Sequence, residues 1–289
     1  MNGAVKLHDG RSVGIAEFGA ADGDAVLWCH GGPGSRLEPA WLDDEARAAG
    51  LRVIGIDRPG YGDSPPAPGR TIVDGARDLL AVADHLGLDR FATVGVSTGG
   101  AYSLATAAVA PDRVSAVVAC CSMTDMSYGP ARSTMSPAHA LDVWDAPDRD
   151  AAIVAATAAH GPHGEKLQGS DGVRTIMCAE DRALFADAHW MGHAMAAFPA
   201  MFRWGLEGYA DDRIADGTGW IDFDVNAIRC PVTVLHGTLD AMCQPVHAEH
   251  TASIVPNARL RMMEGHGHFS IEAFVIPTLK ELLAGDHPG

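Results

Sequence analysis

Short apolar runs alternate with longer amphipathic stretches along the first part of the chain and again near its C-terminus. Uninterrupted apolar runs are typical of strands that are buried on both faces of a sheet. Mainly apolar runs of this kind occupy residues 25–29, 51–56, 91–96, 114–121 and 231–237, and a last strand is predicted at residues 259–263. Amphipathic helices are predicted at residues 39–49, 72–86, 101–110, 246–255 and 271–283. This alternation predicts an α/β fold with a parallel sheet and helices on both faces.

Two stretches depart from the alternation. An Asp9-Gly10-Arg11 turn between short β-like runs predicts an N-terminal hairpin over residues 4–18. From Met123 to Phe223 the chain is rich in Ala, Met, His and Trp and contains no clear buried run. We therefore expect one α/β core formed by residues 1–122 and 224–289, with residues 123–223 inserted as a helical lobe.

Composition narrows the classes of function. Acidic residues outnumber basic ones by 37 to 21, and the resulting net charge of −16 argues against a nucleic acid or an anionic membrane as partner. The first residues lack a signal-peptide pattern, and no apolar run reaches the ~20 residues that span a bilayer. The six cysteines show no C-x-x-C spacing, which is typical of buried thiols in a reducing compartment. We expect a cytoplasmic protein.

A Gly-x-Ser-x-Gly motif, Gly95 to Gly99, follows one predicted strand and precedes a predicted helix. In this context the two glycines leave room for a tight turn that exposes the central hydroxyl group, here that of Ser97. The N-terminus of the following helix favours negative charge on a bound substrate. Ser97 is therefore the candidate nucleophile.

A serine nucleophile needs a base, and the base needs an acid that holds its tautomer. Asp240 and His268 each follow a late predicted strand, and the chain order Ser, Asp, His is the one expected when strand ends gather such groups. Asp125 remains a rival acid and His266 a rival base. The small residues around His268 favour it over His266, because they let the loop turn inward.

Stabilising the oxyanion of a tetrahedral intermediate requires backbone donors. The N–H of Thr98 directly follows the nucleophile, and Gly32 in the glycine-rich turn after an early strand is the candidate for the second donor. His30, Asp57 and Arg58 stand at the ends of early strands, where we expect them to brace the loops rather than to react.

Five motifs in this order resemble the α/β-hydrolase superfamily over nearly the whole chain. They are His30-Gly31-Gly32-Pro33-Gly34, Asp57-Arg58-Pro59-Gly60-Tyr61-Gly62, Gly95-Val96-Ser97-Thr98-Gly99-Gly100, the turn at Asp240, and Gly267-His268-Phe269. The resemblance implies an eight-stranded, mostly parallel sheet with a helical cap over the site, and it assigns the same roles to these residues. Serine at position 97 separates the chain from the haloalkane dehalogenase and epoxide hydrolase branches, which use aspartate there.

The His-Gly-Gly-Pro-Gly turn is also similar to that of the proline iminopeptidases. The chain departs from them at the nucleophile, where it has Gly-Val-Ser-Thr-Gly and they have a Gly-Gly-Ser-Trp-Gly type of sequence. Their caps carry acidic residues that hold the free amine of the substrate. The candidates for that role here are Glu165, Glu180, Asp181 and Glu207. Peptidase activity therefore ranks below esterase activity.

Aromatic and methionine side chains are frequent in residues 123–223 and predict an apolar pocket wall in addition to the lobe's own core. The candidate pocket residues are Trp190, Met195, Phe198 and Trp204. His189 and His193 stand four residues apart on a predicted helix, an arrangement that is common without metal. We expect neither a metal nor a cofactor.

The sequence thus favours a serine hydrolase that cleaves a small to medium carboxylic ester through an acyl-enzyme. An iminopeptidase-like aminopeptidase, a lactonase or a C–C bond hydrolase remains an alternative, and the superfamily also includes cofactor-independent oxygenases. A non-catalytic ligand receptor on the same fold is a different class, which has no need of a complete triad. Self-association through the helical lobe stays open.

Overall fold

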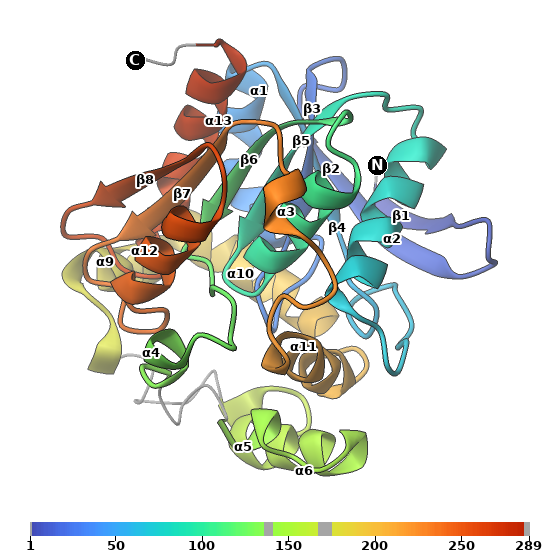
Figure 1. Ribbon diagram of the computed structural model, residues 1–289, viewed down its shortest axis with the longest axis vertical. Coiled ribbons are helices and arrows are strands. Elements are labelled where there is room, and N and C mark those ends of the chain that lie inside the picture. Colours follow the sequence, from blue (N-terminus) through green and yellow to red (C-terminus); the bar gives the residue numbers. More distant parts are fainter. Residues whose placement is uncertain (1, 136–140, 167–174, 286–289) are drawn as a thin grey trace.

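A computed structural model describes residues 2–135, 141–166 and 175–285. Its centre is an eight-stranded sheet with the strand order β1-β2-β4-β3-β5-β6-β7-β8 (Figure 1). The strands are β1 (Asn2–Lys6), β2 (Ser12–Gly19), β3 (Asp24–Cys29), β4 (Leu51–Ile56), β5 (Phe91–Val96), β6 (Val114–Cys120), β7 (Val232–Gly237) and β8 (Ala258–Met263). β1 and β2 form the antiparallel hairpin, β2 is antiparallel to β4, and the other neighbours are parallel. The predicted α/β fold with a mostly parallel sheet is confirmed.

Helices cover both faces of the sheet (Figure 1). One face packs on α2 (Ile72–His85), α3 (Gly99–Val109) and α12 (Pro245–Ile254), and the other packs on α1 (Asp43–Ala48) and α13 (Val275–Leu283), which the turn η4 (Ser270–Phe274) precedes. The stretch predicted as one helix over residues 39–49 is divided into η1 (Glu38–Leu42) and α1, because the backbone of Leu42 leaves the helical region at φ −96° and ψ 7°. Among the described helices, none combines the length and the apolar character that a bilayer crossing requires.

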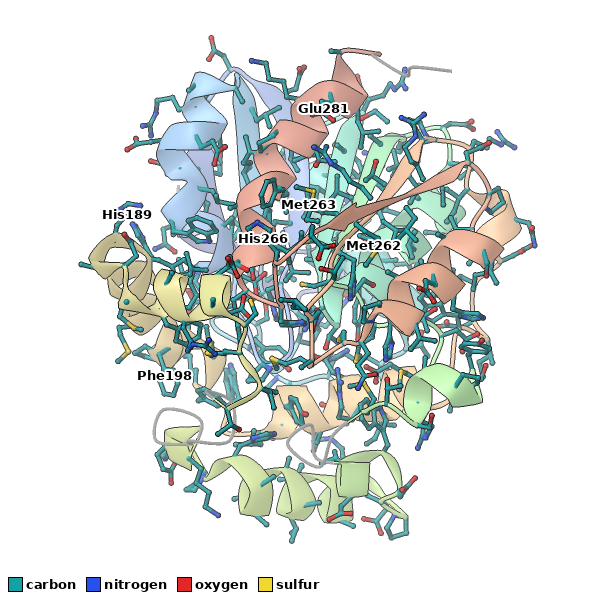
Figure 2. All side chains as sticks on the ribbon, turned by 90° about the vertical axis from the view of Figure 1, so that its left-hand side faces the viewer. His189, Phe198, Met262, Met263, His266 and Glu281 are labelled. Carbon is teal, nitrogen blue, oxygen red and sulfur yellow. The ribbon has the colours of Figure 1, made fainter. Side chains whose placement is uncertain are left out.

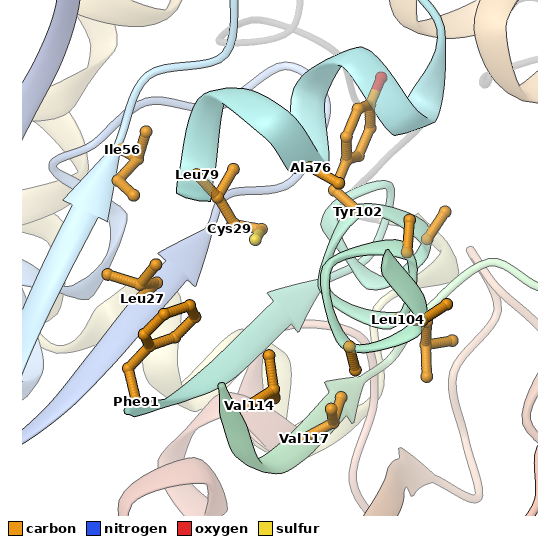
Figure 3. Close-up of a cluster of buried hydrophobic side chains, with 14 of the residues drawn as sticks. Leu27, Cys29, Ile56, Ala76, Leu79, Phe91, Tyr102, Leu104, Val114 and Val117 are labelled. Atoms are coloured by element: carbon orange, nitrogen blue, oxygen red, sulfur yellow. The ribbon is translucent and has the colours of Figure 1, made fainter. Parts of the chain in front are cut away.

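The larger hydrophobic core lies between the sheet and helices α2 and α3 (Figure 3). Leu27 and Phe91 on the strands pack with Leu79 of α2 and Leu104 of α3, and all four side chains are buried. Full burial of an apolar side chain of this size contributes roughly 1.5–3 kcal/mol. The central strands β3 to β7 are mainly apolar because a second core covers the opposite face as well.

Between β6 and β7 the described residues form helices and turns and no strand. The elements are α4 (Gly129–Arg132), α5 (Leu141–Trp144), α6 (Arg149–His160), α9 (Ala179–Ala186), α10 (Ala188–Met201), α11 (Glu207–Gly217) and η3 (Val225–Ala227). We call residues 123–223 the helical segment; its residues 136–140 and 167–174 lie outside the described part. In Figure 1, α5, α6 and α11 lie below the carboxyl ends of the strands.

Two helices of this segment differ in how firmly they are held. α11 carries the buried Asp212, whose carboxylate accepts hydrogen bonds from four side chains of the core: Arg58, Tyr61, Arg70 and Tyr102. The backbone of α11 also touches the loop after β4, since a Cβ atom on Gly208 would lie 2.5 Å from the carbonyl oxygen of Gly60. In α10, by contrast, Ala197 is the one buried residue. α10 makes single hydrogen bonds to the core, from the N–H of Gly62 to the carbonyl oxygen of Ala200 at 2.8 Å and between the His189 ring and the carbonyl oxygen of Trp41 at 3.2 Å. α11 is therefore bound to the core by buried ion pairs that α10 lacks.

Candidate active site

Ser97 lies in the sharp turn between β5 and α3. Its backbone φ is 52°, a left-handed value that is uncommon for a residue with a side chain. The turn closes because its neighbours are glycines: a Cβ atom on Gly95 would lie 2.3 Å from the Gly99 carbonyl oxygen, and one on Gly99 would lie 2.0 Å from that of Cys29. The hydroxyl group is partly exposed and stands at the N-terminus of α3, where negative charge is favoured.

Asp240 lies in the loop that follows β7, His268 lies in the loop that follows β8, and their side chains are in contact. Nδ1 of His268 is 2.8 Å from Oδ2 of Asp240, and Oδ1 of Asp240 accepts hydrogen bonds from the backbone N–H groups of Met242 (2.8 Å) and Cys243 (2.9 Å). A neutral His268 therefore carries its proton on Nδ1, which leaves Nε2 as the acceptor. This is the orientation that a general base requires.

Each member of this pair shifts the pKa of the other. Burial on its own raises the pKa of Asp240, but the charge of His268 and their hydrogen bond hold it below its ordinary value. Burial lowers the pKa of His268, and the charge of Asp240 more than offsets this, so that the pKa lies above its ordinary value. The aspartate is thus anionic and the imidazole is a strengthened base.

The Ser97 hydroxyl group and the His268 ring line one pocket without being hydrogen-bonded to each other among the described residues. The thiol group of Cys243 lies beside the hydroxyl instead. Nucleophile–base hydrogen bonds are often loose without substrate and tighten on binding. The arrangement is therefore compatible with proton transfer from Ser97 once a substrate is bound.

The rival acid and the rival base lie elsewhere. Oδ1 of Asp125 accepts a hydrogen bond from the backbone N–H of Ser127 at 2.8 Å. The His266 ring packs against Phe274, with 4.7 Å between the ring centroids. His266 lies in the turn that follows the last residue of β8, Met263 (Figure 2). The structure therefore brings Asp240, and not Asp125, to His268.

The glycine turn after β3 lies directly against the nucleophile. A Cβ atom on Gly31 would lie 3.6 Å from the Cβ of Ser97, and one on Gly32 would lie 2.7 Å from Oγ1 of Thr98. The N–H of Thr98 stands at the start of α3, where backbone donors have no acceptor within the helix. No residue in the described part accepts a hydrogen bond from the N–H of Gly32. Both donors are therefore free to bind an oxyanion.

The residues expected to brace the loops lie at the base of this turn. Asp57 is buried, and its carboxylate accepts hydrogen bonds from the backbone N–H of Arg36 (2.7 Å), from the Arg36 guanidinium (2.6 Å) and from the backbone N–H of Asp63 (2.9 Å). His30 and Arg58 both hydrogen-bond the carbonyl oxygen of Gly31. These contacts join the loop after β3 to the loop after β4.

A pocket of about 510 Å³ opens beside Ser97 and His268. Its wall is mainly apolar and includes Trp190, Met191, Met195 and Phe198 of α10 together with Phe185 of α9. Figure 2 shows Phe198 on the part of α10 that lies below the sheet. Met195 is 50% exposed, so the pocket reaches solvent on this side.

Trp204 does not line this pocket, contrary to the expectation from sequence. α10 ends at Met201, where the backbone leaves the helical region at Phe202. The Trp204 side chain then turns toward the loop after β4, and its indole N–H donates to the carbonyl oxygen of Gly62 at 3.0 Å. Trp204 therefore ties the helical segment to the core instead of contacting a ligand.

Two glutamates that the sequence did not single out line the pocket: Glu38 and Glu272. Oε1 of Glu38 accepts the N–H of Gly31 at 2.9 Å, and Oε2 accepts the indole N–H of Trp28 at 2.7 Å. Burial raises the pKa of Glu38 to about 7. Burial, together with the charge of Glu38, raises the pKa of Glu272 well above its ordinary value. The pocket therefore holds two buried carboxyl groups whose pKa values both lie above the ordinary range.

The four acidic residues suggested by the resemblance to iminopeptidases lie outside the pocket wall. They are Glu165, Glu180, Asp181 and Glu207. Asp181 is buried, and its Oδ1 accepts hydrogen bonds from the backbone N–H groups of Phe269 (3.2 Å) and Ser270 (2.8 Å). Asp181 thus holds the loop that carries His268.

One group of three ligand types converges in the described part of the chain: Cys121, Asp240 and His268, with their ligand atoms within 4.8 Å of one another. Asp240 and His268 already bind each other, and burial raises the pKa of the Cys121 thiol well above its ordinary value. A thiol that stays protonated is a poor metal ligand. The rings of His189 and His193 are 4.7 Å apart on α10, and among the described residues they belong to no such group of three.

Comparison with known proteins agrees with this architecture. A family model for the alpha/beta hydrolase fold matches residues 24–273. A non-heme chloroperoxidase of Streptomyces lividans is 27% identical over 290 residues, 95% of this chain and 96% of that protein. A proline iminopeptidase of Neisseria gonorrhoeae is 30% identical over 123 residues, 40% of this chain and 38% of that protein. The enol-lactonase of Burkholderia xenovorans LB400 superposes with a TM-score of 0.72 at 21% identity, over 97% of this chain and 99% of that one.

The family model spans most of the chain and includes the candidate nucleophile, acid and base. The chain matches less than half the length of several of its curated relatives, and an identity of 21% to a solved structure shows the fold alone. The family assignment therefore rests on the match over residues 24–273 together with the strand order and the turn at Ser97. The chain belongs to the α/β-hydrolase fold family.

Proposed function

We propose that the protein cleaves small to medium carboxylic esters through an acyl-enzyme formed on Ser97. One observation carries this proposal: Ser97, the His268–Asp240 pair and the N–H groups of Gly32 and Thr98 surround one apolar pocket. A nucleophile, an oriented base and oxyanion donors are the three parts that acyl transfer needs.

In the first half-reaction Oγ of Ser97 attacks the ester carbonyl carbon while Nε2 of His268 takes the hydroxyl proton. The carbonyl electrons move to oxygen, and the resulting oxyanion accepts hydrogen bonds from Gly32 and Thr98. The bond to the leaving alcohol then breaks, and His268 returns its proton to the departing oxygen. Asp240 stays anionic and stabilises the imidazolium between these steps.

In the second half-reaction a water molecule replaces the alcohol. His268 takes a proton from the water as the water attacks the acyl carbon, and the same two N–H groups hold the second oxyanion. Collapse breaks the bond to Ser97, which regains its proton from His268. We propose residues 123–223 as the cap of this site, since α9 and α10 supply its apolar wall.

The proposal is tested by initial rates on p-nitrophenyl esters of increasing acyl length, together with labelling by an alkyl fluorophosphonate. The pocket of about 510 Å³ favours saturable turnover with an optimum at short to medium chains. Mass spectrometry should locate one phosphonyl group on the peptide that contains Ser97. Absence of both turnover and labelling would reject the proposal.

A second candidate function is an aminopeptidase that cleaves after a residue with a free amine. Glu38 and Glu272 favour it, because an ammonium group bound beside them would stabilise their ionised forms. Proline p-nitroanilide, assayed beside the ester series, separates the two candidates. A higher kcat/KM on the anilide than on every ester would place the aminopeptidase first.

The pH dependence of turnover should show an acid limb that reflects His268. Because Asp240 raises the pKa of His268 above its ordinary value of about 6.5, kcat/KM should fall as the pH drops, with its midpoint above 6.5. Below that midpoint the imidazolium cannot accept the Ser97 proton. The measurement is kcat/KM between pH 5 and 9, and a midpoint well below 6.5 would contradict the assignment of the base.

Phe198→Ala should shift the acyl-chain preference. Removing the ring from the pocket wall creates room, so kcat/KM for a long acyl chain should rise relative to a short one by about tenfold. Trp204→Ala is the matched control, because this residue lies on the same side of the molecule but outside the pocket. An equal shift in both variants would mean that the pocket wall is assigned incorrectly.

A further inference from the structure

The turn that carries Gly32 is held from its buried side by Arg58. Nη2 of Arg58 donates a hydrogen bond to the carbonyl oxygen of Gly31 at 2.7 Å, and Nη1 donates to the carbonyl oxygen of His30. The Arg58 side chain is buried. The carbonyl group of Gly31 and the N–H of Gly32 belong to one peptide unit. A cation bound to this carbonyl therefore acts directly on the candidate oxyanion donor.

His30 adds a second hydrogen bond to the same carbonyl oxygen. Nε2 of His30 accepts the backbone N–H of Arg58 at 3.2 Å, so the proton of the neutral ring is on Nδ1, which is 2.6 Å from the Gly31 oxygen. Burial and the charge of Arg58 hold the pKa of His30 well below its ordinary value, which keeps the ring neutral. Hydrogen bonds in series polarise one another, so two donors on the carbonyl make the Gly32 N–H a stronger donor.

We propose that Arg58 is a positioning residue for the acyl transfer: its guanidinium fixes and polarises the Gly31–Gly32 peptide that binds the oxyanion. This inference rests on the proposed function. Asp212 keeps the guanidinium in place by accepting hydrogen bonds from Nε at 3.1 Å and from Nη2 at 2.8 Å. Full negative charge exists only on the oxyanion. The stabilisation that Arg58 adds through the Gly32 N–H therefore grows toward the transition state and affects kcat more than KM.

The chain offers a matched control in Arg70. Its side chain is also buried, and its Nη2 donates to the same Asp212 carboxylate at 2.6 Å. The other hydrogen bonds of Arg70 go to the hydroxyl group of Tyr102 and the carbonyl oxygen of Gly208, and none reaches the glycine turn. Arg58→Met and Arg70→Met each remove one of the two arginine partners of Asp212, but only Arg58→Met removes the guanidinium donor to the carbonyl oxygen of Gly31 and leaves His30 as its other donor.

The experiment compares both variants with the wild type in three measurements: kcat and KM on the preferred p-nitrophenyl ester, the inhibition constant of an aryl trifluoromethyl ketone, and the melting temperature. The ketone forms a hemiketal oxyanion and so reports on oxyanion binding. Arg58→Met should lower kcat by about 10- to 100-fold with little change in KM. It should raise the inhibition constant of the ketone by a similar factor. Arg70→Met should change kcat and ketone binding by less than about threefold, although its melting temperature falls comparably.

A structural role alone predicts a different pattern. Equal losses of kcat in the two variants, or unchanged ketone binding in Arg58→Met, would overturn the inference. If Arg58→Met does not fold, Arg58→Lys retains the charge without the fork that reaches both carbonyl groups and Asp212, and the same losses are expected for it. Failure of the proposed function is a separate result: the wild type would then show no fluorophosphonate labelling of Ser97 and no ester turnover.

Discussion

Ser97→Ala should lower ester turnover by about 10⁴-fold or more while leaving the fold intact. Without Oγ no acyl-enzyme can form, and the oxyanion donors can at best assist attack by water. The alanine side chain fits the turn, since the strained backbone conformation is set by the neighbouring glycines rather than by the hydroxyl group. The measurement is kcat on the preferred ester, together with the circular dichroism spectrum and the melting temperature.

Ser103→Ala is the matched control for this substitution. Ser103 is a buried serine of α3 whose hydroxyl group donates to the carbonyl oxygen of Gly100 at 2.8 Å, away from the pocket wall. Its removal should cost about 1 kcal/mol of stability and leave kcat within a factor of two or three. If Ser97→Ala keeps more than a few per cent of wild-type turnover, Ser97 is not the nucleophile.

Asp212→Ala should lower the free energy of unfolding by about 3–5 kcal/mol. Asp212 is fully buried, and its removal leaves the guanidinium groups of Arg58 and Arg70 without their shared counter-charge. Burial raises the pKa of Asp212, but the charges of these two arginines hold it well below its ordinary value, so the group is anionic at every pH where the protein is assayed. The change is measured by urea denaturation at neutral pH.

Asp145→Asn provides the comparison for an exposed pair in the same helical segment. Asp145 binds Arg132 at 2.9 Å, but its side chain is largely in solvent, and loss of such a pair costs at most about 1 kcal/mol. The dependence of stability on pH in acid provides a second check. Because the folded-state pKa of Asp212 is depressed, its stabilisation is present above the unfolded-state value of about 3.9 and is lost as the pH falls below it. An effect of Asp212→Ala no larger than that of Asp145→Asn would contradict this interpretation.

The sheet could be predicted from sequence because its pattern is local. Each strand from β3 to β7 appears as a mainly apolar run, because both of its faces are covered. β8 contains Arg259 and Arg261 and has no buried residue, and its prediction depended on its place after the preceding helix. The strand order could not be derived in the same way, because pairing between β3 and β5 or between β2 and β4 depends on contacts between distant parts of the chain. The break between η1 and α1 was missed, since helical periodicity continues through Leu42.

The site was predictable where a motif constrains the backbone and unpredictable where function depends on which way a side chain points. The glycines around Ser97 leave few backbone conformations for the turn. Trp204 comes after the end of α10, and the hydrophobic periodicity of the sequence does not predict where the chain goes from there. Glu38 and Glu272 are far apart in the chain and come together only through the loops after β3 and β8. Glu38 stands between Leu37 and Pro39 after the glycine turn, and this lone acid in an apolar stretch was the one available signal.

The unequal attachment of α10 and α11 determines how a substrate can reach Ser97. Moving α11 away from the sheet would separate Asp212 from two buried arginines, whereas moving α10 exposes few additional side chains because most of them already contact water. We therefore expect a substrate to enter by a displacement of α10 near Met195, where the pocket meets solvent. Association rates for large acyl groups should accordingly respond to substitutions along α10, whereas α11 should stay in place when a substrate enters.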